Sequence, residues 1–597
     1  MKKAEIKKSN HSRDIQSRKS NNHWLWILAL IALTIWVFFP GLHNQLTNWD
    51  DNHYINQNKH IAPLNFENLK HYFTTFYIGN YHPFTMLAYA IDYHFFKLDP
   101  FPYHVINLIV HIVNSILVIF FIQKLSQNFR ISVLCGFLFA VHPLHVESVV
   151  WVSERKDVMF MFFYLLGLLN YLRFREEHKT SFLFIAVVAF VFSCLFKAMA
   201  VSFPAVLVLL DYLRVGREIE RSGKRVQSES EVWDSKKFSF SFWINKLPFI
   251  VITLLFGILA LMAQKSAAAV NIFSDHTLWD RIIFVSYGLV FYPMKLLAPF
   301  NLSPYYPYPD KTAGVLPFHY WMYPLLTILL FSIIFVMYRK NFRLGLFCMF
   351  FYLVTILPVI QVVQVGEAIV AERYSYLPSL GIFFIFAYGV EKFADNYKNK
   401  FTQKVIFTVF SIYLLGFSLY SRYYCTLWKD SVTLWTVALK QFPTFALGYY
   451  NRSNEYIQRG QFDLAIADLD KAINSKPNYA HALNNRGYCL HLLGKNKEAY
   501  PDLKRAVEID PSYSDPLNNL GVVCFQLGKP DSAIFYFKKG LELAPEYGEL
   551  YKNIGAVYYN MNDFKNAIIY YEKALKFYPD DKNILMYISQ LKSLVGG

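Results

Sequence analysis

The chain has 597 residues, of which 54% are hydrophobic and 18% aromatic, and its formal net charge is +16. This content is too apolar for several soluble domains and fits a multi-spanning membrane protein with a soluble appendage. The six cysteines form no CxxC pair and no cluster with histidine, which argues against a disulfide framework or a zinc site. The cations lie largely in short tracts between apolar runs, which indicates membrane topology and not nucleic-acid binding.

The N-terminus predicts a retained membrane anchor. Residues 1–23 hold seven lysines or arginines against only Glu5 and Asp14, which is typical of a cytoplasmic basic tail. No small-residue cleavage site follows the apolar run 24–39, so we expect it to remain as the first span. Further apolar runs lie at 102–122, 131–150, 158–172, 181–196, 199–213, 247–263, 281–299, 318–338, 344–363, 374–390 and 405–421. Residues 24–421 are therefore predicted to form an all-α membrane bundle of about 11–12 spans.

Three basic tracts restrict the topology. Residues 214–246, 339–343 and 392–404 should all be cytoplasmic, so an even number of crossings must separate them. Three runs lie between the first two tracts, which predicts that the run 281–299, interrupted by Pro293 and Lys295, is re-entrant or lies at the outer surface. Eleven crossings then leave the N-terminus inside and the C-terminal domain outside. The alternative is an ordinary twelfth span.

The C-terminal part is a repeat. Proline recurs every 34 residues from Pro443 to Pro579, and small residues follow the same step. This pattern resembles the tetratricopeptide repeat (TPR), a helix-turn-helix unit. We expect a linker and a degenerate half-unit at 422–445, four repeats at 446–581 and a capping helix at 582–597, all forming an α-solenoid. The resemblance implies a concave face that binds an acceptor protein, a peptide or another partner protein.

The outer loop after the first span, residues 41–99, carries adjacent carboxylates at Asp50 and Asp51. Adjacent side chains rarely point the same way, so one is expected to face a reaction and the other an internal partner. A helix cap or turn is the alternative. Further along, His82 opens an amphipathic stretch to Leu98 that suits a helix lying along the membrane surface.

A polar stripe marks the second span. His104, Asn107, His111 and Asn114 are spaced three, four and three residues apart, so they share one helical face. Polar groups in a bilayer usually face a cavity or a functional path. The alternative is interhelical hydrogen bonding.

At the outer end of the third span the sequence HPLHVESVVWVSERKD places several polar residues at one interface. Arg155 and Lys156 could neutralise a lipid phosphate, with Asp157 orienting one of them. Glu372 and Arg373 form a second possible phosphate clamp. Lys197 is a weaker candidate, because a lysine near a span end can snorkel. The remaining candidates for contact with donor phosphate or sugar are His82, His142, His145 and Glu147. An exposed charged loop is the alternative.

The sequence contains no GxGxxG or Walker loop, and no second soluble domain for a nucleotide sugar. An activated sugar would then arrive through the bilayer on a polyprenyl phosphate. Such a phosphate is a good leaving group that needs only stabilisation of its charge. The attacking hydroxyl must lose its proton to a base, and a carboxylate can serve as that base.

Four motifs carry a family resemblance: NWDDNHYINQNKHI (48–61), YHPFTMLAYAIDYHFFKL (81–98), YHVINLIVHIVNSIL (103–117) and FAVHPLHVESVVWVSERKDVM (139–159). With the many spans and the TPR units, they resemble the transmembrane-and-TPR protein O-mannosyltransferases of the GT-C class and their bacterial relatives. The resemblance implies inverting transfer of mannose or another hexose from a polyprenyl phosphate to a hydroxyl of an extracytoplasmic protein. It implies that Asp50 and Asp51 are the catalytic pair, with Asp50 favoured as the base and the reverse order left open.

The same resemblance places His82, Glu147, Arg155, Lys156 and Asp157 at motif positions without fixing their roles. Short loops and the lack of a secretory leader favour a bacterial inner membrane with a periplasmic site and an undecaprenyl donor. Asp50 and Asp51 could also ligate a divalent metal, although no cofactor is required. A non-catalytic TPR scaffold for envelope assembly is the main alternative. A transporter fits less well, because the ionisable clusters lie at the outer ends of the spans.

Overall fold

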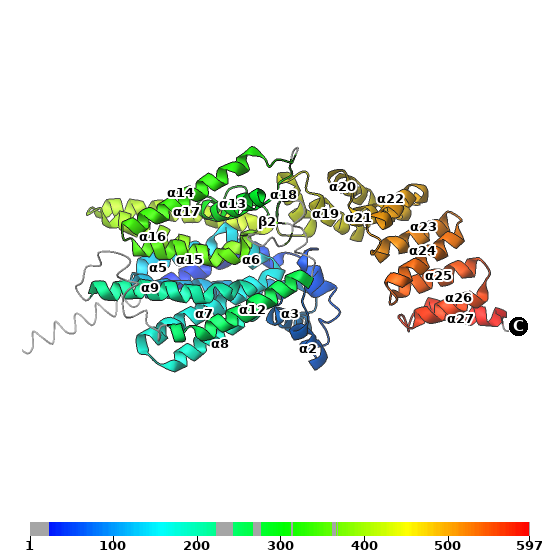
Figure 1. The fold of residues 1–597 in the computed structure, drawn as a ribbon, viewed down its shortest axis with the longest axis horizontal. Helices are drawn as coiled ribbons and strands as arrows, with labels where there is room; N and C mark the ends of the chain where they lie inside the picture. Colours follow the sequence, from blue (N-terminus) through cyan, green and yellow to red (C-terminus); the bar gives the residue numbers. More distant parts are fainter. Residues whose placement is uncertain are drawn as a thin grey trace, which may run out of the picture. The chain divides into compact units, whose positions relative to one another are not determined.

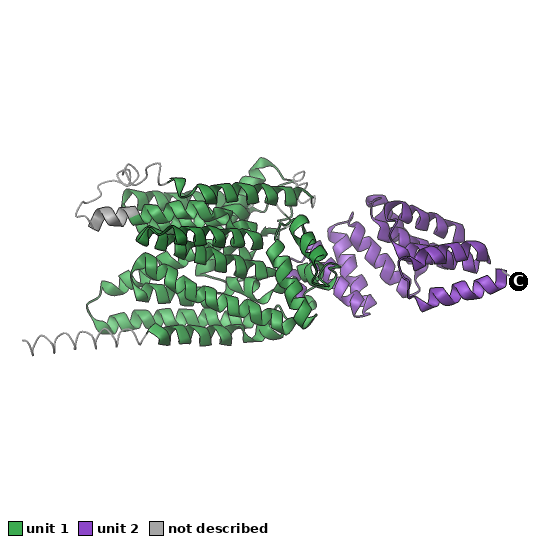
Figure 2. Cartoon of the chain, turned by 90° about the horizontal axis from the view of Figure 1, so that it is seen from below, with its two compact units in different colours: residues 1–434 green, residues 435–597 purple. Residues whose placement is uncertain are grey.

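The computed structural model describes residues 23–221, 243–266, 276–311, 314–360, 366 and 368–595. The chain divides into two compact units, Met1–Leu434 and Trp435–Gly597 (Figure 2). Both units are helical, and the described residues form just one small sheet, in which β1 (Tyr306–Pro307) pairs antiparallel with β2 (Ala368–Val370). Most of the basic tail 1–23 and of the basic tract 214–246 lies outside the described residues.

Unit 1 opens with the helix His23–His43. Its further helices (Figure 1) are α2 (Phe66–Thr74), α3 (Pro83–Phe96), α4 (Pro100–Ser126), α5 (Phe129–Val141), α6 (Val146–Val150), α7 (Arg155–Glu177), α8 (Thr180–Phe196), α9 (Phe203–Arg221), α12 (Leu247–Ser266), α13 (Leu278–Leu297), α14 (Met322–Arg339), α15 (Arg343–Ile356), α16 (Ser379–Asp395) and α17 (Lys400–Thr426). α18 (Ser431–Gln441) begins at the end of this unit.

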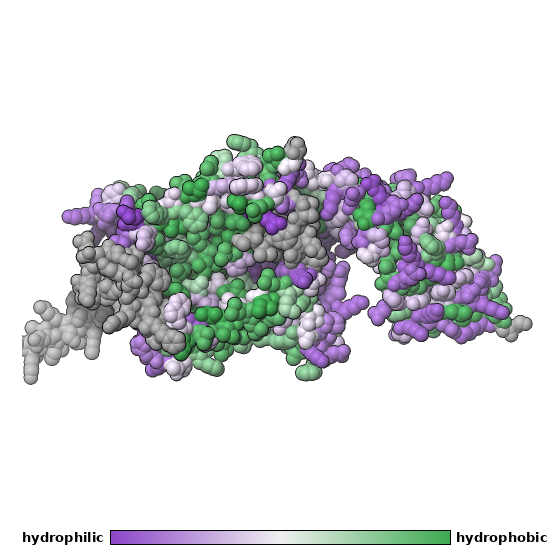
Figure 3. Space-filling view, viewed as in Figure 1, coloured by the Kyte–Doolittle hydropathy of each residue, from purple (hydrophilic) through white to green (hydrophobic). Residues whose placement is uncertain are grey.

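Within the described residues, each predicted apolar run overlaps one or two of these helices. Six helices in the described residues are long and apolar enough to cross a membrane, or seven if the bent pair Phe129–Val141 and Pro143–Val150 is one span. The six are His23–His43, Pro100–Ser126, Val152–Glu177, Leu247–Ser266, Phe318–Arg339 and Lys400–Thr426. The remaining runs give shorter helices or helices that carry charges, so they do not add to this count. Apolar side chains cover much of the visible face of the unit, as expected of a multi-pass membrane protein (Figure 3).

The run 281–299 forms the uninterrupted helix α13, with Pro293 inside it. The chain then doubles back along this helix, because Tyr308 packs on Phe284 with ring centroids 5.1 Å apart. Lys311 reaches the first turn, where its Nζ lies 2.8 Å from Asp280. The segment after α13 thus returns to the end from which α13 started, and whether the run 281–299 is re-entrant stays a prediction.

Unit 2 is a row of helix pairs: α19 (Ala446–Gln458) with α20 (Phe462–Ser475), α21 (Ala480–Leu492) with α22 (Asn496–Ile509), α23 (Ser514–Gln526) with α24 (Pro530–Leu543), and α25 (Gly548–Asn560) with α26 (Phe564–Leu575). A last helix, α27 (Lys582–Val595), covers the apolar face of α26. Small residues recur where paired helices meet, since a Cβ on Gly521 would lie 2.4 Å from the Phe537 ring. The predicted repeat architecture is confirmed.

Candidate active site at the start of α7

The loop that carries the acidic pair is held firmly by the end of α17. Asn44 donates its side-chain amide to the carbonyl of Cys425 at 3.0 Å, and the Gln45 amide donates to the Lys429 carbonyl at 2.8 Å. The Asn48 amide donates to Ser431 Oγ at 2.9 Å. The two residues that follow Trp49 therefore have a fixed backbone.

Asp50 and Asp51 face different surroundings. Asp51 is buried, and its carboxylate accepts hydrogen bonds from the amide and hydroxyl of Thr47 at 2.8 and 3.0 Å and from the amide of Ser153 at 2.9 Å. The Ser153 hydroxyl donates a fourth bond. The side chain of Asp50 is 22% exposed, and its nearest cation, the Nζ of Lys156, lies 3.7 Å away. Asp51 thus binds the loop to residue 153, while Asp50 is open to a ligand.

Burial sets the charge states around this pair. Burial raises the pKa of Asp51 to about 6, because loss of hydration outweighs the bonds from Ser153 and Thr47. Burial and the charge of Lys156 lower the pKa of His82, the residue that precedes α3, to about 3. At pH 7 Asp51 is therefore mostly ionised and His82 is neutral.

Three cations converge on one buried carboxylate, Glu154, which is 0% exposed. Its oxygens lie 3.0 Å from Lys156 Nζ, 3.5 Å from Lys197 Nζ and 3.3 Å from Arg373 Nε. The cations come from the start of α7, the end of α8 and the segment that precedes α16. Their side chains are 9–15% exposed, so each keeps a limited opening to a ligand.

Two further carboxylates orient these cations. Glu147 accepts from the backbone amide of Arg373 at 2.8 Å and from its guanidinium. Asp157 pairs with Lys197 and accepts from the hydroxyl of Ser148 at 3.1 Å. Asp157 was expected to orient Arg155 or Lys156, and it instead holds Lys197. Glu147 and Asp157 therefore hold the side chains of Arg373 and Lys197 in place beside Glu154.

Aromatic rings surround the same cluster. Lys156 Nζ lies 5.3 Å from the centroid of the Tyr54 ring, and Arg373 lies over Trp151 at 5.5 Å. Apart from the ion-paired oxygens of Glu154, three buried polar atoms beside these cations have no hydrogen-bond partner within the described residues: Tyr54 Oη, His82 Nε2 and Trp151 Nε1. Buried polar groups are normally paired, so these atoms are candidates for contact with a polar ligand.

Arg155 does not fit the phosphate-binding role expected for it. The side chain is 2% exposed and forms an ion pair with Asp92 of α3. It also donates to Asn107 Oδ1 and to the Tyr103 carbonyl, each at 2.8 Å. With three of its N–H groups donating inside the protein, Arg155 joins α3, α4 and α7, and Lys197 takes its place among the partly open cations at Glu154.

His142 uses both ring nitrogens inside the protein, whereas His145 Nε2 and Glu372 Oε2 are buried without a hydrogen-bond partner in the described residues. His142 Nε2 contacts the Leu296 carbonyl at 3.0 Å, and its Nδ1 accepts from the Leu144 amide. His145 bonds to the Phe139 carbonyl at 2.8 Å. Buried Glu372 accepts from the hydroxyls of Tyr306 and Tyr424 and from the amide of Ser303. The main partners of His142 and Glu372 lie far away in sequence, so the motif alone could not show these contacts.

The polar face of the second span supports the interhelical alternative. His104 contacts the Asn44 carbonyl at 3.0 Å, and Asn114 donates to the Val158 carbonyl at 2.8 Å. His111 contacts the Tyr376 hydroxyl at 2.7 Å, and Asn107 accepts from Arg155. All four residues join α4 to the segments that carry the candidate site.

Within the described residues, no group of three or more His, Cys, Asp or Glu side chains has the geometry of a metal site. Sequence reasoning missed the roles of Glu154, Tyr54 and Trp151 and underrated Lys197. The one available signal for Lys197 was its place at the end of an apolar run, which also suits a snorkelling lysine.

The fold and the site define a class: a multi-pass helical membrane protein with a C-terminal tetratricopeptide array. Models of the tetratricopeptide repeat match residues 454–494, 478–546 and 548–581. YrrB, a TPR protein described as having an unusual peptide-binding site, is 24% identical to the array. The match covers 26% of this chain and 80% of that one, with a TM-score of 0.24.

The resemblance expected from the motifs is confirmed by curated relatives. The human protein O-mannosyl-transferase TMTC1 is 22% identical over 440 residues, which cover 68% of this chain and 49% of the relative. Human protein O-mannosyl-transferase TMTC3 is 24% identical, covering 70% and 47%. Protein O-mannosyl-transferase F38B6.6 of Caenorhabditis elegans is 24% identical, covering 67% and 54%. The chain spans about half the length of these relatives.

Proposed function

We propose that the chain is a GT-C type glycosyltransferase that uses a lipid-phosphate sugar. It moves a hexose, mannose by analogy with the named relatives, from a polyprenyl phosphate to a hydroxyl of an extracytoplasmic protein or envelope glycan. The observation that carries the proposal is the position of one open carboxylate, Asp50, beside three cations gathered on buried Glu154.

The reaction requires a base and a stabilised leaving group. Asp50 takes the proton of the acceptor hydroxyl while its oxygen bonds to the anomeric carbon. The bond from that carbon to the phosphate oxygen breaks, and the electron pair leaves with the phosphate. Lys156, Lys197 and Arg373 stabilise the charge that develops there. Attack from the side opposite the phosphate inverts the anomeric configuration.

The unpaired polar atoms support a sugar as the ligand. Tyr54 Oη, His82 Nε2 and Trp151 Nε1 lie in the same part of the site, and a hexose has several hydroxyls that both donate and accept. A bound sugar would satisfy these atoms, whereas an empty site leaves them buried without partners.

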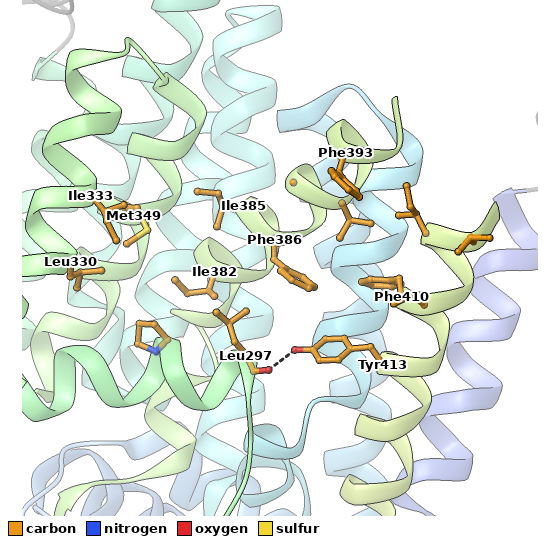
Figure 4. Close-up of a pocket in the computed structure, with 16 residues that line it drawn as sticks. Leu297, Leu330, Ile333, Met349, Ile382, Ile385, Phe386, Phe393, Phe410 and Tyr413 are labelled. Atoms are coloured by element: carbon orange, nitrogen blue, oxygen red, sulfur yellow. Dashed lines mark hydrogen bonds between the residues drawn. The ribbon is translucent and has the colours of Figure 1, made fainter. Parts of the chain in front are cut away.

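An apolar pocket supports a lipid-linked donor. It has a volume of about 830 Å³ and lies between α13, α14, α15, α16 and α17, with almost entirely apolar lining (Figure 4). Leu297 lies at one end, where its carbonyl accepts from Tyr413 at 2.6 Å. The segment after Leu297 bonds to Glu372, the neighbour of Arg373, through Ser303 and Tyr306. An isoprenoid chain in this pocket would thus start near the cation cluster.

The TPR array then recruits the acceptor or a partner protein. The proposed setting is a bacterial inner membrane, with the acidic loop and the array on the periplasmic side. Lys246, the last residue of the basic tract 214–246 and the one that precedes α12, forms a buried ion pair with Asp211 of α9. α7 runs from the cation cluster to this end, where its Arg175 also pairs with Asp211. This agrees with a site opposite the cytoplasm.

The test is transfer of labelled sugar in purified membranes from synthetic polyprenyl-phosphate mannose, glucose and galactose. The full chain is compared with Asp50→Asn and with Asp99→Asn, an exposed helix cap at the end of the same loop that asparagine also caps. We expect transfer by the wild type and Asp99→Asn but not by Asp50→Asn. Absence of transfer from all donors would favour a TPR scaffold.

A further inference from the structure

Two short segments lie side by side at the candidate site. Trp49 stacks on Trp151, with ring centroids 4.3 Å apart and ring planes 21° from parallel. Two residues further along each segment, the Asp51 carboxylate accepts from the amide of Ser153 at 2.9 Å and from its hydroxyl. We call these two pairs, Trp49 with Trp151 and Asp51 with Ser153, the two-point contact. The step of two residues is the same on both segments, so the segments run parallel.

The two-point contact lies next to the groups that the proposed reaction uses. Asp50 is the middle residue of the first segment, and Glu154, which gathers the cations, directly follows Ser153. The Nζ of Lys156 lies 3.7 Å from the Asp50 carboxylate and 3.0 Å from that of Glu154. The two-point contact therefore joins the segment that carries the proposed base to the segment that carries the proposed phosphate site.

The second segment, residues 151–153, has anchors of its own. Tyr89 of α3 donates its hydroxyl to the Val152 carbonyl at 3.1 Å. Asn107 of α4 donates its side-chain amide to the Trp151 carbonyl at 3.4 Å. Because two helices hold this segment, it is a fixed support for the loop that carries Asp50.

The side chain of Asp50 depends on its backbone for its position. It is 22% exposed, and its contact with Lys156 is longer than a hydrogen bond. The cations have carboxylate partners away from the acidic loop, since Arg373 pairs with Glu147. Lys197 pairs in the same way with Asp157. Loss of the two-point contact should thus move the base and leave the phosphate site in place.

The proposed transfer requires an accurate separation between base and phosphate. The acceptor oxygen must lie within hydrogen-bond reach of the base and close to the carbon that bears the phosphate. A displacement of about 1 Å can lower a rate about 10²-fold. Contacts at two points restrain both the translation and the rotation of the loop, whereas a single contact leaves rotation free.

We propose that Trp49 and Ser153 are positioning residues, which hold the Asp50 carboxylate at a fixed distance from the cations through the two-point contact. The inference rests on the proposed function, since it assigns both residues to the same transfer. Trp49 acts through the backbone that it shares with Asp50, and Ser153 acts through Asp51. The two-point contact sets the rate of transfer and not the affinity for the donor phosphate.

The test measures two quantities in the same preparations of the full chain. They are single-turnover transfer from polyprenyl-phosphate mannose, glucose and galactose, and binding of polyprenyl phosphate. The variants are Trp49→Leu, Ser153→Ala, the two combined, and Trp49→Phe, which keeps an aromatic ring on Trp151. Trp24→Leu and Ser332→Ala are the matched controls, because both side chains are exposed on other helices. The melting temperature of each variant is recorded.

We expect Trp49→Leu to transfer about 10²-fold and Ser153→Ala about 10-fold more slowly, with phosphate affinity within about 2-fold of the wild type. The combined variant should lose less than the product of the two, because both changes release the same loop. Trp49→Phe should regain most of the rate, and both controls should transfer like the wild type.

Two results would overturn the inference while the proposed enzyme stands. One is wild-type transfer that neither Trp49→Leu nor Ser153→Ala slows. The other is an equal loss of binding and transfer that Trp49→Phe does not relieve, which would assign these residues to folding alone. Absence of transfer by the wild type from every donor would instead contradict the proposed enzyme, and with it the positioning role.

Discussion

Adjacent carboxylates at the outer loop have separate tasks in this structure. Asp51 has four donors and no exposed surface, whereas Asp50 keeps an open side chain beside Lys156. Because the Asp51 carboxylate is buried against its own four donors, an acceptor hydroxyl reaches the open carboxylate of Asp50 more readily. The proposed base is therefore Asp50, and Asp51 positions it.

The raised pKa of Asp51 predicts a pH-dependent stability. Its folded pKa of about 6 lies above the ordinary 3.8, so the protonated form is favoured in the fold. The resulting contribution is complete below pH 3.8 and is lost as pH rises through about 6. The melting temperature of the wild type minus that of Asp51→Asn should therefore rise as pH falls from 7 to 4. A difference that is constant over this range would contradict the assigned environment.

Arg155 and the exposed cations should behave differently when replaced. Arg155→Leu leaves Asp92 buried without its cation, which should cost about 3–5 kcal/mol of stability. Lys156→Gln and Lys197→Gln also take a cation from a buried carboxylate, but in addition they should raise the KM for the donor about 10-fold or more with the acceptor KM unchanged, since a bond to a charged group contributes about 1.5–3 kcal/mol.

Kinetics with donor and acceptor varied separately, together with melting curves, measure both effects. Lys179→Gln, which removes one partner of an exposed ion pair, is the control for loss of a positive charge. An increase confined to the acceptor KM would exclude phosphate binding by Lys156 and Lys197.

At the scale of elements, the site depends on helix ends that meet at Glu154. The start of α7 contributes Lys156, the end of α8 contributes Lys197, and the short helix Glu372–Ser375 before α16 contributes Arg373. The sequence predicted Lys156, Lys197 and Arg373 as separate phosphate-binding candidates, because charged residues at the ends of apolar runs are easily recognised. It did not show that residues 154, 197 and 373 converge, because that contact depends on the packing of helices far apart in sequence.

The apolar pocket predicts a dependence on donor chain length. Gly389 of α16 lines the pocket, and no atom lies within 4 Å of an added Cβ. Gly389→Phe should fill the pocket and lower transfer from a long polyprenyl donor several-fold, while transfer from a two-isoprene donor changes little. Gly416→Phe, at an equally open glycine of α17 outside the pocket lining, is the matched control. Equal losses with both donors would show that the pocket does not bind the polyprenyl chain.

For the whole molecule, the sequence predicted the two-part architecture well. The 34-residue proline step gave the TPR helices, and hydropathy placed a helix at each apolar run. The number of spanning helices was less predictable, because the bend after α5 and the return of the chain after α13 depend on tertiary contacts. The roles of Arg155 and His142 were misread for the same reason.

Removal of residues 446–597 tests whether unit 1 performs the transfer while the TPR array recruits the protein acceptor. We expect transfer to a protein acceptor to fall at least about 10-fold, while transfer to a small alcohol stays near the wild-type rate, because the proposed reaction uses unit 1 alone. The amounts of the full chain and of the shortened chain inserted in the membrane must be matched. Equal loss on both acceptors would instead assign the array a role in folding.

The central claim is that the cations bind the donor phosphate while Asp50 performs the proton transfer. The most direct measurement determines polyprenyl-phosphate binding and single-turnover transfer in the same preparations of wild type, Asp50→Asn and Lys197→Gln. We expect that Asp50→Asn binds like the wild type but transfers about 10²–10⁴-fold more slowly, and that Lys197→Gln loses binding. Wild-type transfer by Asp50→Asn, or undiminished binding by Lys197→Gln, would contradict it.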